Sequence, residues 1–279
     1  MVEKKVAVGA CTGYGHYLGS VARRAEYHVV DELRKDKSVL LCPPALAAGV
    51  EEDVRFIKEH PVVSIEGCAA QCQRKIVELA GGHVDAVVIV EEIAKRNNII
   101  IDKNKREVDK KLAYLVGEEA SKIVDKIYNG YKEVLPSYGI PRCQVCVQGD
   151  VCVVPCTGMG KALGGAARLG GFKAEERGCV ATYVCLPSLA AKSGKYEDAV
   201  KNMPSITIDG CVEKCASKIV QSSGGKIKNR IFVPKLLKDK GLKPPENRME
   251  LGEEGEAVGK GIADEIEKFV AKMKVEESK

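Results

Sequence analysis

The chain is predicted to fold as an α/β protein: two tandem copies of a parallel-sheet domain with helices on both faces. Two observations lead to this prediction. The first is an internal repeat, because residues 8–20 read VGACTGYGHYLGS and residues 153–165 read VVPCTGMGKALGG. The second is that short apolar runs alternate with longer helical patterns, which is typical of parallel sheets covered by helices.

The repeat extends far beyond the first motif. LLCPPALAAG at residues 40–49 is answered by YVCLPSLAAKSG at 183–194. Near the end of each copy, VGEEASKIVDKIYNGY at 116–131 resembles VGKGIADEIEKFVAKM at 258–273. A period of about 145 residues is a domain duplication and is too long for a solenoid unit.

The repeat also predicts the domain boundaries. We expect a first domain over residues 1–133 and a second over residues 148–279. Residues 134–147 lie between the copies and contain Pro136 and Gly139, so we expect a linker there.

The first copy is predicted to hold four strands, because four short apolar runs are bounded by turn residues. These runs occupy residues 5–10, 38–42, 61–65 and 85–90. Helical patterns follow the first three runs, at about 15–35, 49–59 and 66–82. Pro43 and Pro44 end the second run, and Gly81 and Gly82 close the third helix.

A long helix is predicted to end each copy. In the first copy it covers residues 107–131 and carries an apolar stripe that includes Leu112, Val116 and Tyr131. The last helix of the chain repeats this stripe. The pattern leaves open whether each stripe packs on its own sheet or on the other copy.

Four cysteines recur at matched positions in the two copies. They are Cys11, Cys42, Cys68 and Cys72 in the first copy, and Cys156, Cys185, Cys211 and Cys215 in the second. The spacing is also repeated, since 26 positions separate Cys42 from Cys68 and Cys185 from Cys211. Most other positions differ between the copies, so the repeat indicates one four-thiolate site in each.

The predicted strands bring these cysteines together. Cys11, Cys42 and Cys68 each follow a strand, and sites in open parallel sheets form beyond the carboxyl ends of strands. Cys72 is four residues after Cys68, so we expect both on one face of a helix near its N-terminus. The helix dipole should lower their pKa values there, which favours metal-binding thiolates.

The chemistry of four thiolates suits zinc or an iron–sulfur cluster. The simpler interpretation of any one cysteine is a small buried hydrophobe, but eight at matched positions argue against it. Glu66 and Asp209 precede the Gly-Cys pair in their copies. Each is expected to cap a helix or to support the metal ligands.

The glycine-rich loops at 12–19 and 157–164 allow a competing interpretation as phosphate cradles. A dinucleotide-binding fold would place an acidic residue at the end of the second strand. Cys42 and Cys185 stand there instead, so we favour glycines that let the backbone approach a metal.

Four further cysteines lie outside the repeated set. They are Cys143, Cys146, Cys152 and Cys179. The spacing of Cys143 and Cys146 resembles that of chelating or redox pairs, so these two, with Cys152 or Cys179 or both, are candidates for an additional metal or redox site. Cys152 and Cys179 fall in apolar, strand-like runs, where core packing is the simpler interpretation. The four histidines do not recur in the second copy, and we assign none as a ligand.

Composition narrows the classes of function. The 44 basic and 39 acidic side chains are spread along the chain, and there is no Trp, so nucleic-acid binding is not expected. We find neither a signal peptide nor an apolar run long enough to span a membrane. We therefore expect a cytoplasmic protein, in which clustered cysteines bind metal or do redox chemistry more often than they form disulfides.

The EGC-x-x-x-C and DGC-x-x-x-C elements, with the CTG and C-[PL]-P motifs upstream, resemble the DGC-domain family. That family is described as binding zinc through four cysteines, which the resemblance places at the eight repeated positions above. Glu66 replaces the Asp of the family's Asp-Gly-Cys triplet in the first copy. The resemblance implies a metal site and no particular reaction.

Three functional hypotheses follow from the sequence. The first is a zinc-binding protein with one four-cysteine site per domain. The second is an iron–sulfur redox or sulfur-transfer protein that uses the same cysteines. The third is a non-catalytic assembly protein that binds a protein partner or a second copy through its long amphipathic helices.

Overall fold

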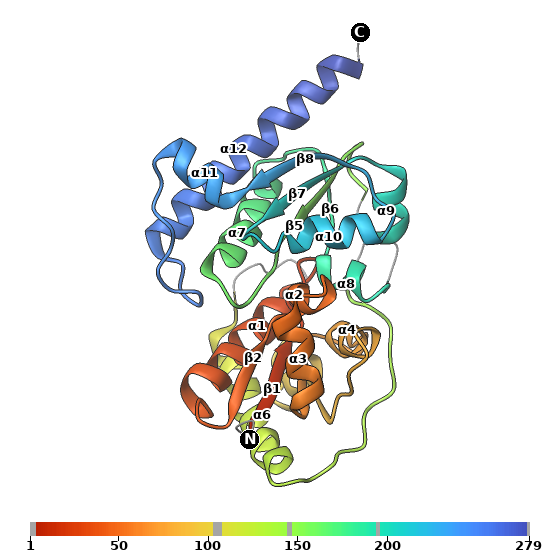
Figure 1. Cartoon of the computed structure of the whole chain (residues 1–279), viewed down its shortest axis with the longest axis vertical. Coiled ribbons are helices and arrows are strands. Elements are labelled where there is room, and N and C mark those ends of the chain that lie inside the picture. The colour runs from red at the N-terminus through yellow and green to blue at the C-terminus, as the bar shows by residue number, and fades with distance from the viewer. Residues whose placement is uncertain (1–3, 103–107, 144–146, 194–195, 278–279) are drawn as a thin grey trace. The chain divides into compact units, whose positions relative to one another are not determined.

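The computed structural model describes residues 4–102, 108–143, 147–193 and 196–277. The chain divides into two compact units, residues 1–143 and 144–279. Each unit contains its own four-stranded sheet in which neighbouring strands are parallel (Figure 1). The predicted α/β class with two tandem domains is confirmed.

The first sheet has the strand order β2-β1-β3-β4. Its strands are β1 (Val6–Ala10), β2 (Ser38–Leu41), β3 (Val62–Glu66) and β4 (Ala86–Ile89). All of β1 and β3 is buried, as expected for central strands covered on both faces.

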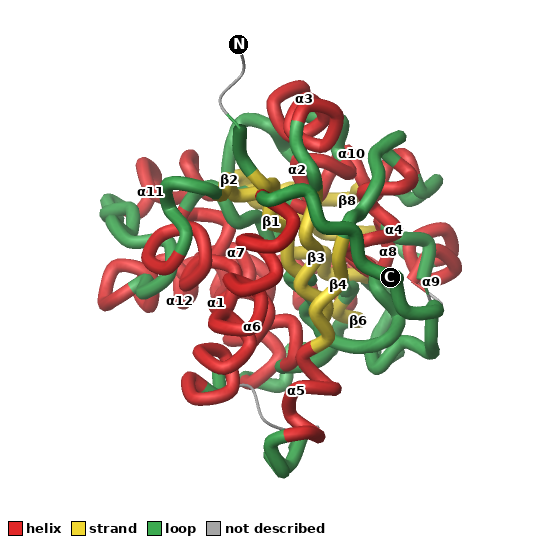
Figure 2. Tube along the Cα trace, turned by 90° about the horizontal axis from the view of Figure 1, so that it is seen from below, coloured by secondary structure: helices red, strands yellow, loops and turns green. Residues whose placement is uncertain are grey.

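The crossovers of the first unit run in opposite directions from β1. Its helices are α1 (Leu18–Tyr27), the π-helical η1 (His28–Leu33), α2 (Pro43–Ala47), α3 (Glu51–Glu59), α4 (Cys72–Leu79), α5 (Val90–Arg96) and α6 (Lys110–Tyr128). The chain moves from β1 toward one edge of the sheet to reach β2, and from β3 toward the other edge to reach β4. Since such connections are right-handed, α1 and α4 cover opposite faces of the sheet (Figure 2).

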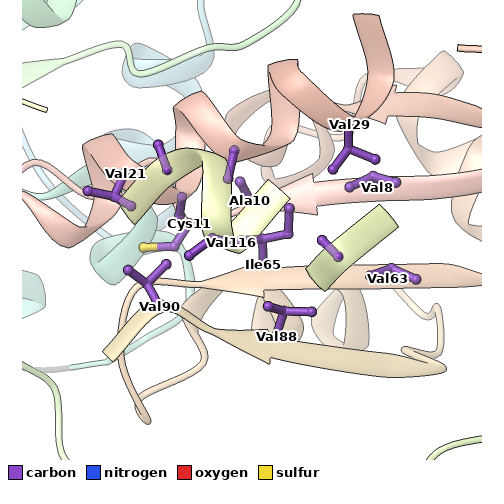
Figure 3. Packing of buried hydrophobic residues seen from close by; sticks show 14 of the residues in the cluster. Val8, Ala10, Cys11, Val21, Val29, Val63, Ile65, Val88, Val90 and Val116 are labelled. Carbon is purple, nitrogen blue, oxygen red and sulfur yellow. The ribbon is translucent and has the colours of Figure 1, made fainter. Parts of the chain in front are cut away.

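One face of the first sheet carries an apolar core under α1, α5 and α6. Val8 and Ile65 of the sheet meet Val21 of α1 and Val116 of α6 in this cluster (Figure 3). The stripe of the long helix therefore packs within its own unit. Tyr131, which we expected on the stripe, lies beyond the end of α6 and is 55% exposed.

Several predicted helices differ in detail. The helix expected at 15–35 is α1 continued by η1. The prolines after β2 begin the short helix α2, because proline suits the first helical turn. The long helix begins at Lys110, where the Asp109 carboxylate accepts the N–H of Leu112 at 3.0 Å.

The second sheet repeats the order as β6-β5-β7-β8. Its strands are β5 (Cys152–Pro155), β6 (Thr182–Tyr183), β7 (Ser205–Asp209) and β8 (Ile227–Phe232). Its helices are α7 (Ala162–Glu176), α8 (Leu186–Ala190), α9 (Tyr196–Asn202), α10 (Cys215–Ser222), α11 (Val233–Lys240) and α12 (Gly252–Glu277). Helix α12 packs on α7 of the same unit. No helix in the described part of the chain is long and apolar enough to cross a membrane.

Candidate metal centre

The repeated cysteines of the first unit lie at the carboxyl edge of its sheet. The chain turns to opposite sides after β1 and β3, so the crevice between these two strands is the topological switch point. Cys11 directly follows β1, and its N–H donates to the carbonyl of Ile65 in β3 at 2.7 Å. Cys68 comes two residues after β3. These two thiols therefore flank the switch point.

Both thiols also touch the same apolar core. Cys11 is 9% exposed and belongs to the cluster under α1, and Cys68 packs against that cluster. In Figure 3, Cys11 lies between Val21 and Val90. The surroundings of Cys11 thus suit a small hydrophobic side chain as well as a ligand.

The other two cysteines of the first unit begin helices. Cys42 is the N-cap of α2, and Cys72 is the first residue of α4. These two helices pack against each other. The N–H of Cys42 donates to the Asp53 carboxylate at 2.7 Å, which fixes the backbone at this end of β2.

The second unit places its cysteines in the same way. Cys156 directly follows β5, and Cys185 is the N-cap of α8. Cys211 follows β7 by two residues, and Cys215 begins α10, which packs against α8. The two sets therefore occupy equivalent places in two separate sheets.

The prediction that Cys68 and Cys72 share a helix face is wrong. Residues 68–71 form a turn in which the carbonyl of Cys68 accepts the N–H of Gln71 at 3.2 Å, and α4 begins only at Cys72. Gln71 has a φ of 51°, in the left-handed region that non-glycine residues rarely adopt. This residue reverses the chain between the two cysteines.

The second unit builds the same turn. The carbonyl of Cys211 accepts the N–H of Lys214 at 3.2 Å, and Lys214 also has a φ of 51°. A strained backbone kept at the same place in both units holds the third cysteine of each set apart from the following helix.

The expected lowering of the Cys68 pKa is also wrong. Burial raises the pKa of the Cys68 thiol, and the backbone N–H groups of Arg142 and Ala70 oppose that shift in part. Since Cys68 lies outside α4, the helix terminus does not compensate for the loss of water.

Glu66 stabilises the start of α4. It is 1% exposed, and its two carboxylate oxygens accept the N–H groups of Gln73 at 3.3 Å and Arg74 at 2.7 Å. The hydroxyl of Ser64 donates to the same carboxylate at 2.6 Å. Burial raises the pKa of Glu66, and these hydrogen bonds offset part of the rise.

Asp209 has the same place at the start of α10 but different partners. Its carboxylate accepts the N–H of Ser217 at 3.2 Å and the Ser217 hydroxyl at 2.5 Å. That hydroxyl also lies 2.8 Å from Thr207 Oγ1, and Arg230 Nε lies 3.5 Å from the Asp209 carboxylate. Burial raises the pKa of Asp209, and the bonds from Ser217 lower it in part.

A comparison with protein families agrees with this duplicated arrangement. The DGC domain matches residues 7–126 and again residues 152–270. The chain belongs to the DGC domain family. The two matches cover most of both units, so the chain is a tandem pair of DGC domains. No curated protein and no solved structure matches it.

The glycines of the two DGC loops serve backbone packing. A Cβ atom at Gly19 would lie 2.5 Å from the carbonyl oxygen of Gly13, and one at Gly164 would lie 2.6 Å from that of Gly158. No side chain fits at these contacts, so the glycine pairs let the loop lie directly on the first turn of α1 or the corresponding turn of α7.

Of the four additional cysteines, Cys143 and Cys146 fall between the two DGC matches, and Cys152 and Cys179 fall within the second. Cys143 ends the first unit and is half-buried, and Cys146 lies outside the described residues. Cys152 is the first residue of β5 and fully buried, which raises its pKa to about 12. Cys179 lies in the loop after α7 rather than in a strand, and it contacts Tyr183.

The chemistry of the donor set fits a soft metal, since each sheet edge carries four thiols. Their positions do not form a closed cage: within the described ranges, no group of three or more His, Cys, Asp or Glu side chains could hold a metal ion. Every cysteine in those ranges is outside a disulfide. A metal would therefore have to draw the four side chains together.

One element beside the first site was not predicted. Residues 131–143, which include most of the linker expected at 134–147, lie within the first unit and bond to the turn that carries Cys68. We call this segment the strap. Its prolines and glycine are typical of linkers, and contacts made by backbone carbonyls leave no signal in a sequence.

Proposed function

We propose that each DGC domain binds one metal ion through its four repeated cysteines, and that the ion is zinc. One observation carries the proposal: two separate sheets place four cysteines at the same strand ends and helix starts. Packing alone would not require the same residue type at all eight places, because any small apolar side chain can fill such a position.

The proposed ligands are Cys11, Cys42, Cys68 and Cys72 in the first domain, and Cys156, Cys185, Cys211 and Cys215 in the second. A closed set of four thiolates leaves zinc no open position, so the role of such a site is structural or in metal handling. Glu66 and Asp209 hold the starts of α4 and α10 in place and so position Cys72 and Cys215.

Metal binding must be coupled to local rearrangement. Two of the thiols in the first domain touch the apolar core under α1, and the other two begin helices on the opposite face. Rotation of cysteine side chains between staggered positions, with small loop shifts, is the movement that would join them. Thiols must also lose their protons, so binding releases protons and weakens in acid.

The experiment is metal analysis of the full chain purified without oxygen. We expect a colourless protein that carries about two zinc ions per chain. A brown protein with iron and labile sulfide would instead show that the same cysteines bind an iron–sulfur cluster. A chain that contains no metal after such a preparation, and takes up none when reduced and titrated with zinc, would overturn the proposal.

A further inference from the structure

The strap lies against the turn of the first site through its backbone. The N–H of Gly139 donates to the carbonyl of Ala69 at 2.6 Å, and Ala69 directly follows Cys68. A Cβ atom at Gly139 would lie 2.6 Å from the Cβ of Ala69, closer than such atoms approach in proteins. The strap can therefore reach this turn only because residue 139 is glycine.

Side chains of the turn and of α4 hold the strap from the other side. The Gln71 amide donates to the carbonyl of Ser137 at 2.7 Å, and Arg74 Nη1 donates to that of Pro136 at 2.9 Å. The Arg74 guanidinium also lies over the ring of Tyr138, 4.4 Å from its centre. Gln71 is fully buried beneath these contacts.

The end of the strap contacts the thiol itself. The backbone N–H of Arg142 is hydrogen-bonded to Cys68. The side chain of Arg142 is anchored on α5, where its Nε donates to the Glu91 carboxylate at 2.8 Å. Backbone bonds and an ion pair thus fix the strap on both sides of Cys68.

The equivalent turn of the second domain is open. Val212 stands in the place of Ala69 and is 69% exposed, and Lys214, in the place of Gln71, is exposed as well. Over the described residues of the second unit, no hydrogen bond joins a separate segment to Val212 or Lys214. The two turns share their backbone but not their cover.

We propose that the strap controls access to the first cysteine site, so that the Cys68 thiol reacts with solutes more slowly than the Cys211 thiol. The inference goes beyond metal binding, because a strap laid against the turn of the half-buried Cys68 limits the approach of any reagent in solution. It predicts one guarded and one open site in the same chain, and it adds residues 131–143 to the functional parts of the first domain.

The test measures alkylation of single cysteines in the reduced, chelator-treated full chain, with iodoacetamide as the probe and mass spectrometry of each peptide as the readout. Gly139→Ala should lift the strap and raise the alkylation rate of Cys68 about tenfold, equivalent to about 1.4 kcal/mol. The rate at Cys211, measured in the same sample, should stay unchanged. Gly160→Ala is the matched control, because a Cβ there meets no atom within 4 Å.

A second variant keeps the test decisive if Gly139→Ala disturbs folding. Tyr138 is 41% exposed, so Tyr138→Ala removes its contacts with Arg74 and Lys75 without opening the core. We expect a rise of about threefold at Cys68 alone, about 0.7 kcal/mol by the same conversion. A Cys68 rate equal to wild type in Tyr138→Ala, or an equal rise at Cys211, would overturn the inference.

This outcome is separable from that of metal analysis. The alkylation rates are measured on metal-free protein, so a strap effect can be found in a chain that never binds zinc. Conversely, two bound zinc ions with identical Cys68 rates in wild type and both variants would leave the proposed function intact and reject the strap.

Discussion

The two DGC domains stabilise the start of equivalent helices, α4 and α10, with different side chains. In the first domain, the longer carboxylate of Glu66 reaches the N–H groups of α4 directly. In the second, the shorter Asp209 is joined by the Ser217 hydroxyl, which also contacts Thr207, and by Arg230. Both domains thus place a buried carboxylate at the start of this helix. Where the carboxylate side chain is shorter, neighbouring polar side chains add the missing hydrogen bonds.

The cover of the two cysteine turns differs more than their backbones do. Both turns contain a residue with a φ of 51° just before the fourth cysteine. Only the first is crossed by a strap, as judged from the described residues. Duplication therefore kept the geometry that presents the thiols, while the surroundings of the two sites diverged.

The largest expected effect concerns whether the two sites are independent. Replacing Cys68 and Cys72 with serine should reduce bound metal to about half, because the second set lies in a separate sheet. Replacing Cys211 and Cys215 should do the same. Cys179→Ser is the control and should leave the metal content unchanged. Complete loss of metal from either double variant would show one shared site instead of two.

A smaller effect should separate the glycines before Cys68 and Cys211. A Cβ at Gly210 would lie 2.8 Å from backbone atoms of Leu163 and Gly164, whereas one at Gly67 would be no nearer than 3.3 Å to any atom outside its neighbours. We expect Gly210→Ala to lower the free energy of unfolding of its domain by about 3 kcal/mol and Gly67→Ala by about 1 kcal/mol.

Hydrogen exchange of the β3 and β7 peptides reads the stability of each domain separately. Gly160→Ala serves as the unstrained reference for both glycines. Equal losses in Gly67→Ala and Gly210→Ala would mean that the two domains relax around the added methyl group to the same extent.

The two helix-start networks should respond unequally to loss of a hydroxyl. Ser217→Ala removes contacts to Asp209 and Thr207, so we expect a loss of about 2 kcal/mol. Ser64→Ala removes one bond to Glu66 and should cost about 1 kcal/mol. Both changes are nearly isosteric. Denaturant unfolding monitored by hydrogen exchange measures the free energy of unfolding of each domain. A larger loss in Ser64→Ala would reverse our ranking of the networks.

The smallest effect concerns the ion pairs that tie the last helix of each domain to the rest of its fold. Arg34 and Lys37 lower the pKa of Asp125 on α6, and Arg177 lowers that of Asp264 on α12. All these side chains are partly exposed, so we expect Asp125→Asn and Asp264→Asn each to cost about 0.5 kcal/mol.

The pH dependence of this cost has a definite sign. The folded pKa of each aspartate is below its unfolded value of 3.8, so the stabilisation is present above pH 3.8 and is lost as the pH falls through the folded pKa. Unfolding curves of wild type and variants should therefore converge in acid. A gap that stays constant down to strongly acidic pH would contradict the assignment.

Much of the fold could be predicted because its signals are local. The runs KVAVGA and PVVSI are mainly apolar, as is typical of central parallel strands, and they became β1 and β3. Helices α5 and α11 were missed, since each follows its strand without a turn residue to mark the boundary. The left-handed Gln71 and Lys214 were also missed, because neither residue type favours that conformation.

By itself, the sequence determined the duplication, the succession of strands and helices along the chain, and the four cysteines at each sheet edge. Repetition and apolar periodicity are properties of the residue types alone. Only the tertiary structure decided that Cys68 lies in a turn, that burial raises its pKa, and that the expected linker is a strap. These features depend on hydrogen bonds between backbone groups and on exclusion of water. Every residue carries the same backbone groups, so their pairing becomes visible only in the folded chain.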